Sequence, residues 1–311
     1  MPAAATAAPA PPEPASSAQA VTGFMHGFSV EATRPKPADI EALKRVVAPG
    51  TDVYLSAIPT RAPEEVIDQA IAVQAAGLSP VPHVAARNIA SARQLDALLG
   101  RFTAEAGVRK LLIVAGDREQ AAGPYLGAIE VIASGLLQRH GIQEIGISGH
   151  PDGHPRLSVE ALDRALAAKT DAAGQSGLKA TIVTQFGFDP DAVIAWLNRI
   201  RDLGYEHPVR VGMAGPTSLT TLLRYAARCG VKASALGASR QAGLVKHLFS
   251  VGAPDGMVRR IAEAAARGGL GEVGAHFFSF GGVDATARWA AAAAAGRFTI
   301  DRQDGFTVAA G

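Results

Sequence analysis

The chain has 311 residues, of which 48% are hydrophobic and 19% charged, and its formal net charge is +2. This balance is typical of a globular protein with a large core, and the length allows one large α/β domain or two average ones. Because Lys and Arg are scattered and aromatic residues make up only 5%, we expect no nucleic-acid partner. Cys229 is the only cysteine, which excludes an internal disulfide and a cysteine-rich metal site.

The first twenty residues are mostly Ala, Pro and Ser and contain no Lys or Arg. They lack the basic start of a secretory signal, and their prolines oppose a helix. We predict a disordered tail over residues 1–20 and a single domain over residues 21–311. No apolar run approaches the ~18 residues needed to cross a bilayer, so we expect no membrane association and a cytoplasmic location.

Eight short apolar runs follow the tail, separated by longer segments with helical patterns. The runs are rich in β-branched or bulky residues and do not alternate cleanly with polar ones, as expected of parallel strands buried on both faces. In chain order they cover residues 27–32, 53–58, 80–86, 110–117, 144–150, 179–186, 209–215 and 275–280.

Helix-start signals lie between the runs: Pro63 followed by two glutamates, the capping pattern SARQ at 91–94, and Asp189-Pro190. Eight strand–helix units over ~280 residues predict a closed (β/α)8 TIM barrel. An open doubly wound sheet is the alternative, but no glycine fingerprint follows the first run. About 60 residues with two or three helical patterns separate the last two runs, so we predict extra helices before the last strand.

Polar residues collect at the ends of the predicted strands, where a barrel has its active site. Glu31 ends FSVEA and is either a solvated loop carboxylate or a general acid whose pKa is raised by partly apolar surroundings. Asp117 ends LLIVAGD. By itself, a Gly-Asp pair at the end of a strand is most typical of a turn. Gln185 lies in the otherwise apolar TIVTQF, so its amide either bonds a neighbouring backbone or awaits a polar ring such as a pterin or flavin.

His150 and His154 in ISGHPDGHP have the separation of two metal ligands on one helical face. Prolines at 151 and 155 and glycines at 149 and 153 oppose a regular helix there. Because no third His or Cys lies nearby in the sequence, we predict no metal site.

The segments FSVEATRP, VPHVAARNI, VAGD, GHPDGHP, AAKTDAAG, TIVTQFGFD and HFFSF occur in this order. Together they resemble the methylenetetrahydrofolate reductase family over most of residues 24–282, and TQFGFD and GHPDGHP are the most specific parts. The resemblance implies a cytoplasmic flavoprotein of one-carbon metabolism and methionine biosynthesis. It would reduce 5,10-methylenetetrahydrofolate to 5-methyltetrahydrofolate with NADH or NADPH, by ping-pong hydride transfer through bound FAD.

The same resemblance implies roles for individual residues. Glu31 falls on the general acid and Asp117 on a second catalytic carboxylate close to flavin and folate. Gln185, Phe186 and Asp117 fall on folate-binding positions, and Leu219 replaces an aromatic residue that packs on substrate and nicotinamide. The cofactor-binding positions are Ser56, His83, Ala115, Gly116, Asp117, Ser148, His150, His154 and Lys169.

The sequence departs from the family pattern at three places. Ala115 occupies an arginine position, His150 occupies a tyrosine position, and two glycines after Phe280 replace the usual Asn-Arg. These losses favour one alternative, a flavin-free reductase with direct hydride transfer from nicotinamide to folate. A second alternative is a non-catalytic folate-binding partner subunit. NADH or NADPH preference, the oligomeric state and the direction of the pathway stay open.

Overall fold

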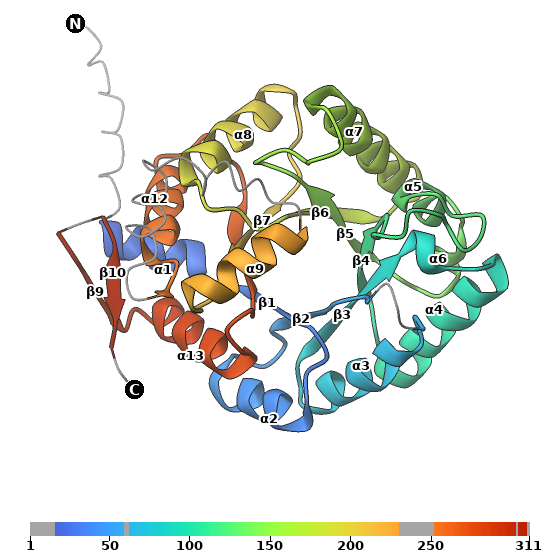
Figure 1. The fold of residues 1–311 in the computed structure, drawn as a ribbon, viewed down its shortest axis with the longest axis horizontal. Coiled ribbons are helices and arrows are strands. Elements are labelled where there is room, and N and C mark those ends of the chain that lie inside the picture. The colour runs from blue at the N-terminus through green and yellow to red at the C-terminus, as the bar shows by residue number, and fades with distance from the viewer. Residues whose placement is uncertain (1–15, 59–61, 230–251, 303, 310–311) are drawn as a thin grey trace, which may run out of the picture.

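The computed structural model describes residues 16–58, 62–229, 252–302 and 304–309, and its centre is a closed barrel of eight parallel strands (Figure 1). Neighbouring strands follow the chain order, and β8 pairs with β1 to close the barrel. The predicted TIM barrel and its eight strands are therefore confirmed. The strands are β1 (Ser29–Ala32), β2 (Asp52–Leu55), β3 (Ser79–Ala85), β4 (Lys110–Val114), β5 (Glu144–Gly149), β6 (Lys179–Thr184), β7 (Val209–Ala214) and β8 (Val273–Phe278).

Helices form a ring around the barrel (Figure 1). Two predicted helix starts are confirmed, because the side chains of Ser91 and Asp189 accept hydrogen bonds from backbone N–H groups of the helices that they begin. The ring contains α2 (Pro37–Val46), α3 (Glu65–Ala75), α4 (Ala92–Ala106), α5 (Ala128–Ile132), α6 (Leu136–Arg139), α7 (Val159–Gln175), α8 (Pro190–Asp202), α12 (Asp255–Ala266) and α13 (Val283–Ala294), and the short 3-10 helix η1 (Ala86–Asn88) follows β3.

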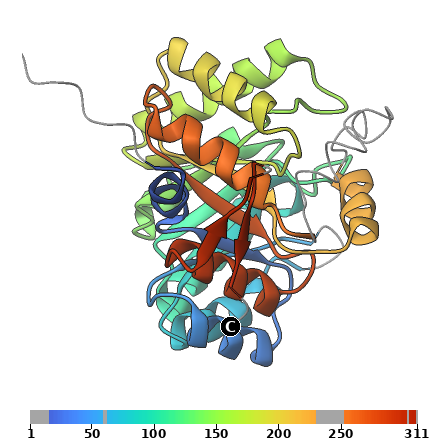
Figure 2. The ribbon, with the colours of Figure 1, turned by 90° about the vertical axis from the view of Figure 1, so that its left-hand side faces the viewer.

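Helix α9 (Leu219–Cys229) lies outside this ring, at the end of the barrel where the strands finish (Figures 1 and 2). Both α9 and α12 fall between β7 and β8, which confirms the predicted extra helices before the last strand. Residues 230–251, between these two helices, lie outside the described part of the chain.

The N-terminal helix α1 (Ser17–Met25) corrects the predicted disordered tail, which is wrong from Ser16 onward. The Ser16 hydroxyl accepts from the N–H of Gln19, and the Gln19 side chain accepts from the N–H of Ser16. Val21 and Met25 are fully buried where the helix packs against α12 and α13. A capping box and an apolar face thus form a helix directly after the proline-rich segment. Residues 1–15 lie outside the described chain.

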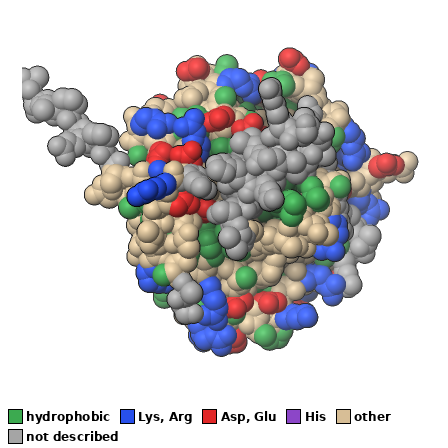
Figure 3. All heavy atoms as spheres, turned by 60° about the vertical axis from the view of Figure 1, so that its left-hand side comes forward, with side chains coloured by type: hydrophobic (Ala, Val, Ile, Leu, Met, Phe, Trp, Pro, Cys, Tyr) green, Lys and Arg blue, Asp and Glu red, His purple; other side chains and the backbone are tan. Residues whose placement is uncertain are grey.

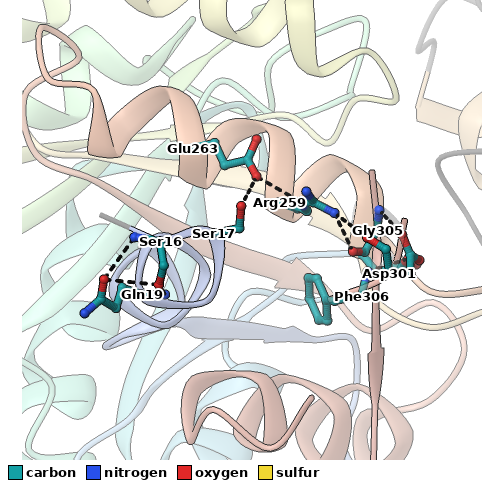
Figure 4. Close-up of polar contacts among 9 residues, drawn as sticks. Ser16, Ser17, Gln19, Arg259, Glu263, Asp301, Gly305 and Phe306 are labelled. Atoms are coloured by element: carbon teal, nitrogen blue, oxygen red, sulfur yellow. Dashed lines mark hydrogen bonds and ion pairs between the residues drawn. The ribbon is translucent and has the colours of Figure 1, made fainter. Parts of the chain in front are cut away.

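A C-terminal hairpin, β9 (Phe298–Ile300) and β10 (Phe306–Val308), was not predicted. Figure 4 shows how it is tied to α1 and α12. Glu263 accepts from the Ser17 hydroxyl at 2.6 Å and from Arg259 Nε at 2.8 Å. Arg259 also donates to the carbonyl oxygens of Asp301 and Gly305, both at 3.1 Å. Helix α1 and the C-terminal hairpin therefore both bind to α12.

The barrel interior is filled at its middle and at its N-terminal end. Tyr54, Val81, Leu112 and Val183 pack together inside it. At the strand starts, Lys110 bonds Asp52 at 2.8 Å and contacts Glu144 at 3.2 Å. These contacts fill the N-terminal part of the barrel, whereas barrel enzymes have their active sites at the C-terminal end, the mouth of the barrel.

The outer surface carries Lys and Arg interspersed with Asp and Glu over the face drawn in Figure 3. Within the described residues, every helix is too short or too polar to span a lipid bilayer.

Candidate active site

Glu31 lies near the C-terminal end of β1. Its register partners are Tyr54 on β2 and Phe278 on β8. The side chain is only 12% exposed, and Oε1 accepts a hydrogen bond from the Ser56 hydroxyl at 2.7 Å. The Ser56 hydroxyl also lies 2.8 Å from that of Thr33. Two residues that the sequence assigned to different roles, acid and cofactor contact, therefore touch each other.

Two histidines face the other carboxylate oxygen of Glu31. The Nε2 atoms of His83 on β3 and His276 on β8 each lie 3.6 Å from Oε2. The sequence assigned His83 to the cofactor and gave His276 no role. A single histidine inside the apolar run AHFFSF was the signal for it, since a buried polar residue in a strand requires a partner.

These histidines overturn the expected pKa of Glu31. Burial alone raises the pKa of the carboxyl group, but His83, His276 and Ser56 together outweigh burial and lower it below its usual value. The predicted rise in the pKa of Glu31 is therefore wrong. Burial is also the largest effect on His83 and lowers its pKa.

Lys169 and Ser148 form a second polar group, between α7 and the C-terminal end of β5. Lys169 Nζ on α7 donates to the Ser148 carbonyl at 2.7 Å and to its hydroxyl at 2.9 Å. Burial lowers the pKa of Lys169 to about 8. The ammonium group of Lys169 is thus tied to the backbone and the side chain of Ser148, near the end of β5.

The turn after β5 carries His150 and His154, and it is not helical, as predicted. Burial, with Lys169 next, lowers the pKa of His150 to about 4, so this ring is neutral at pH 7. His154 Nδ1 accepts from the backbone N–H of Arg156 at 3.2 Å. In the neutral ring the proton then lies on Nε2, which leaves His154 as a donor.

The segment after β4 contains Ala115, Gly116 and Asp117. Gly116 has φ +87°, and a Cβ there would lie 3.0 Å from that of Ala85, so glycine allows both the left-handed backbone and the close contact with β3. Asp117 is exposed. Burial lowers the pKa of His154, and the charge of Asp117 opposes part of this shift. Asp117 therefore lies near the β5 turn.

Gln185 follows β6 at the same rim. Its Oε1 accepts from the N–H of Phe186 at 3.0 Å, so a neighbouring backbone group satisfies the amide carbonyl. Phe186 is only 1% exposed and packs 4.9 Å from Phe280. Phe186, a predicted substrate contact, is therefore buried in a cluster of rings with Phe278 and Phe280, which we call the aromatic wall. Asp152 packs against Gly187 and links this segment to the β5 turn.

Tyr225, and not Leu219, brings an aromatic ring from α9 to the wall. The Tyr225 and Phe280 rings stack at 4.1 Å and 11°, whereas Leu219 is 53% exposed. A Cβ on Gly281 would clash with the Pro216 carbonyl oxygen, so only glycine lets these two loops meet. The sequence reasoning missed Tyr225, although RYAARC has the helical pattern that carries it.

The residues at the expected flavin positions do not fit the diphosphate of FAD. Lys169 is the one Lys or Arg among them, and its ammonium group donates to the carbonyl and the hydroxyl of Ser148. Ala115 carries no charge where the family has arginine, and burial keeps His150 neutral. A diphosphate requires cations or several N–H donors, which these side chains do not offer.

A groove of about 310 Å³ between α7 and α8 opens beside Ser148 and His150. Its lining is mainly apolar, and its two charged residues, Asp163 and Arg199, form an ion pair with each other. This groove therefore offers no uncommitted charge to a phosphate.

The fold and the mouth together define a TIM barrel with a buried acid, two histidines and an amide at the end where barrel enzymes bind their substrates. Residues 32–247 match the family model of methylenetetrahydrofolate reductase, and the chain belongs to this family. Glu31 stands one residue before the matched segment.

The solved structures that resemble this chain are distant from it in sequence. An uncharacterized protein from Clostridium thermocellum, which binds two copies of 5-methyl-5,6,7,8-tetrahydrofolic acid, is 12% identical with a TM-score of 0.55. The match covers 86% of this chain and 93% of that one. Dihydropteroate synthase from Thermus thermophilus is 18% identical with a TM-score of 0.46, over 84% and 89% of the two chains.

Proposed function

We propose that the protein reduces 5,10-methylenetetrahydrofolate to 5-methyltetrahydrofolate, with NADH or NADPH as the source of hydride. Membership of the methylenetetrahydrofolate reductase family supports this reaction. The folate bound by the Clostridium thermocellum protein supports a folate site in a barrel of this shape. The resemblance further implies a cytoplasmic enzyme that serves methionine biosynthesis, and we include both in the proposal.

The geometry of Glu31 is the observation that carries the proposal. Ser56 holds Oε1, so Oε2 is the oxygen that can carry a proton toward a ligand in the mouth. Reduction begins when this proton passes to the leaving nitrogen of the five-membered folate ring and the C–N bond breaks. The resulting iminium ion accepts hydride at its exocyclic carbon and becomes the methyl group. A folate that excludes water from the mouth also raises the pKa of Glu31, which favours the protonated acid.

Gln185 and Asp117 bind the pterin in this proposal. The Gln185 carbonyl is engaged by Phe186, so its amide N–H groups would donate to the ring acceptors. Asp117 is exposed beside the β5 turn and would accept from the amino group of the pterin. Tyr225 and Phe280 supply an apolar wall to the same mouth.

Hydride reaches the folate directly from the nicotinamide in the form of the reaction that we favour. The poor fit of the diphosphate at Ala115, His150 and Lys169 supports this flavin-free form over transfer through FAD. The nicotinamide and the folate are both planar and can face each other in a mouth lined by aromatic side chains. Holding them in this orientation lowers the free-energy barrier to hydride transfer.

One experiment separates the candidates. The purified protein is scanned for flavin absorbance and assayed with methylenetetrahydrofolate and either nicotinamide, with and without added FAD. We expect no flavin spectrum and turnover that added FAD does not change. A flavin spectrum, or turnover that requires FAD, would establish the flavoprotein instead. Folate binding without turnover under every condition would favour the non-catalytic partner subunit.

A further inference from the structure

The two oxygens of the Glu31 carboxyl group have different surroundings. Oε1 bonds the Ser56 hydroxyl, whereas Oε2 lies 3.6 Å from Nε2 of both His83 and His276. Both Nε2 atoms are buried and have no hydrogen-bond partner among the described residues. Three polar atoms thus converge on one point, just beyond direct hydrogen-bond distance.

His276 is held rigidly in this arrangement. Its Nδ1 lies 2.9 Å from the Ser29 hydroxyl, and both residues are buried, at 0% and 2% exposure. Its ring packs edge-on against Tyr54 at 4.6 Å and Phe278 at 5.1 Å. Because Ser29 can donate to Nδ1, the neutral ring can carry its proton on Nε2, which then faces Glu31.

The titratable groups that face Glu31 come from three other strands. Tyr54 on β2 has a pKa raised strongly by burial and stays neutral. His83 on β3 is 10% exposed in its side chain, whereas His276 on β8 is completely enclosed. The charged residues Asp52, Lys110 and Glu144 lie at the opposite end of the barrel. Among the described residues, Glu31 and the two histidines are therefore the groups that can exchange a proton at this point of the mouth.

We propose that His276, fixed by Ser29, is the positioning residue of Glu31 and holds its carboxyl group through Nε2–H while Glu31 gives its proton to the folate. The inference rests on the proposed reduction, which consumes one proton in each turnover. The proton leaves Oε2 for the folate nitrogen, and the carboxylate that remains is stabilised by the Nε2–H of His276. Solvent then replaces the proton through His83, the less enclosed of the two histidines.

Protonation of Glu31 can be measured without any reaction. The carboxyl stretch of the substrate-free protein is followed by infrared titration and assigned by its loss in Glu31→Gln. Since His276 lowers the pKa of Glu31, we expect the transition to move to higher pH in His276→Ala, and by less in His276→Gln, which retains a donor. A transition unchanged in both variants would overturn the proposal.

Kinetics test the positioning role. We expect His276→Ala to lower kcat about tenfold to a hundredfold with little change in KM, because a misplaced acid slows only the chemical step. His276→Gln recovers part of this loss, and Ser29→Ala, which keeps the imidazole, loses less than His276→Ala. His140→Gln is the matched control, because His140 bonds Asp96 away from the mouth.

The proposed reaction and the proposed positioning role of His276 can be rejected independently of each other. If the wild type shows no folate turnover but the infrared transition shifts as expected, the proposed reaction is wrong and the Glu31–His276 coupling holds. If the wild type turns over and His276→Ala matches it in rate and pH profile, the reaction holds and the positioning role is wrong. Should His276→Ala fail to fold, His276→Gln and Ser29→Ala provide the same comparison.

Discussion

The ammonium group of Lys169 on α7 donates to the carbonyl and the hydroxyl of Ser148 on β5, at 2.7 and 2.9 Å. These two bonds join α7 to the end of β5, and the lysine is buried there at 7% exposure. A cation that the resemblance places at a cofactor position thus also joins a helix to a strand of this barrel.

We expect the difference in stability between the wild type and Lys169→Met to depend on pH. The pKa of about 8 in the folded protein lies below the ordinary value of 10.5, so the unfolded chain binds the proton more tightly. The free energy of unfolding of the wild type should therefore rise relative to Lys169→Met from pH 8 to 10.5, by about 3 kcal/mol. Urea unfolding of both proteins across this range measures the difference, and a pH-independent difference would contradict the buried lysine.

Glu31→Gln should remove the acid and retain the shape of the mouth. We expect kcat for folate reduction to fall at least about a hundredfold, because a positioned general acid contributes this much or more. Ser56→Ala is the graded control: it frees Oε1 but leaves the carboxyl group, and should lower kcat about tenfold. Steady-state kinetics with methylenetetrahydrofolate measure kcat for both variants and for the wild type. A Glu31→Gln rate near that of the wild type would exclude this acid.

Gly281→Ala should disturb the aromatic wall. The added Cβ meets the Pro216 carbonyl, so the two loops must separate and shift Tyr225 from Phe280. We expect KM for folate to rise about tenfold, since packing at the mouth orients the ring. Gly174→Ala in α7, where a Cβ meets no atom within 4 Å, is the control. Equal KM values in the two variants would show that the wall does not contact the folate.

Phe306→Ala should destabilise the protein through the C-terminal hairpin. The ring is 2% exposed and packs on Trp289 at 5.6 Å and Phe298 at 4.8 Å. Truncating a buried phenylalanine costs about 3–5 kcal/mol of unfolding free energy. Leu203→Ala, at a side chain 58% exposed, should change it by about 0.5 kcal/mol or less. Denaturant unfolding compares the two, and similar losses would mean that the hairpin does not support the fold.

The sequence predicted most of the fold because its signals are local. Each buried strand is a short apolar run, and the side chain of Asp189 caps α8 as its position before proline indicates. The prediction missed α1, whose Ala- and Ser-containing start resembles the proline-rich segment before it. It also missed β9 and β10, which have three residues each and too little pattern to recognise.

By itself the sequence determined eight parallel strands in chain order, and with them the position of Glu31, Asp117 and Gln185 at one rim. Only the tertiary structure decided which atoms these side chains meet. Ser29 and His276 lie 247 positions apart and become partners through the closure of β8 onto β1. The physical reason is that strand order follows from local patterns, whereas hydrogen bonds, burial and the resulting pKa of Glu31 depend on side-chain packing across the closed barrel.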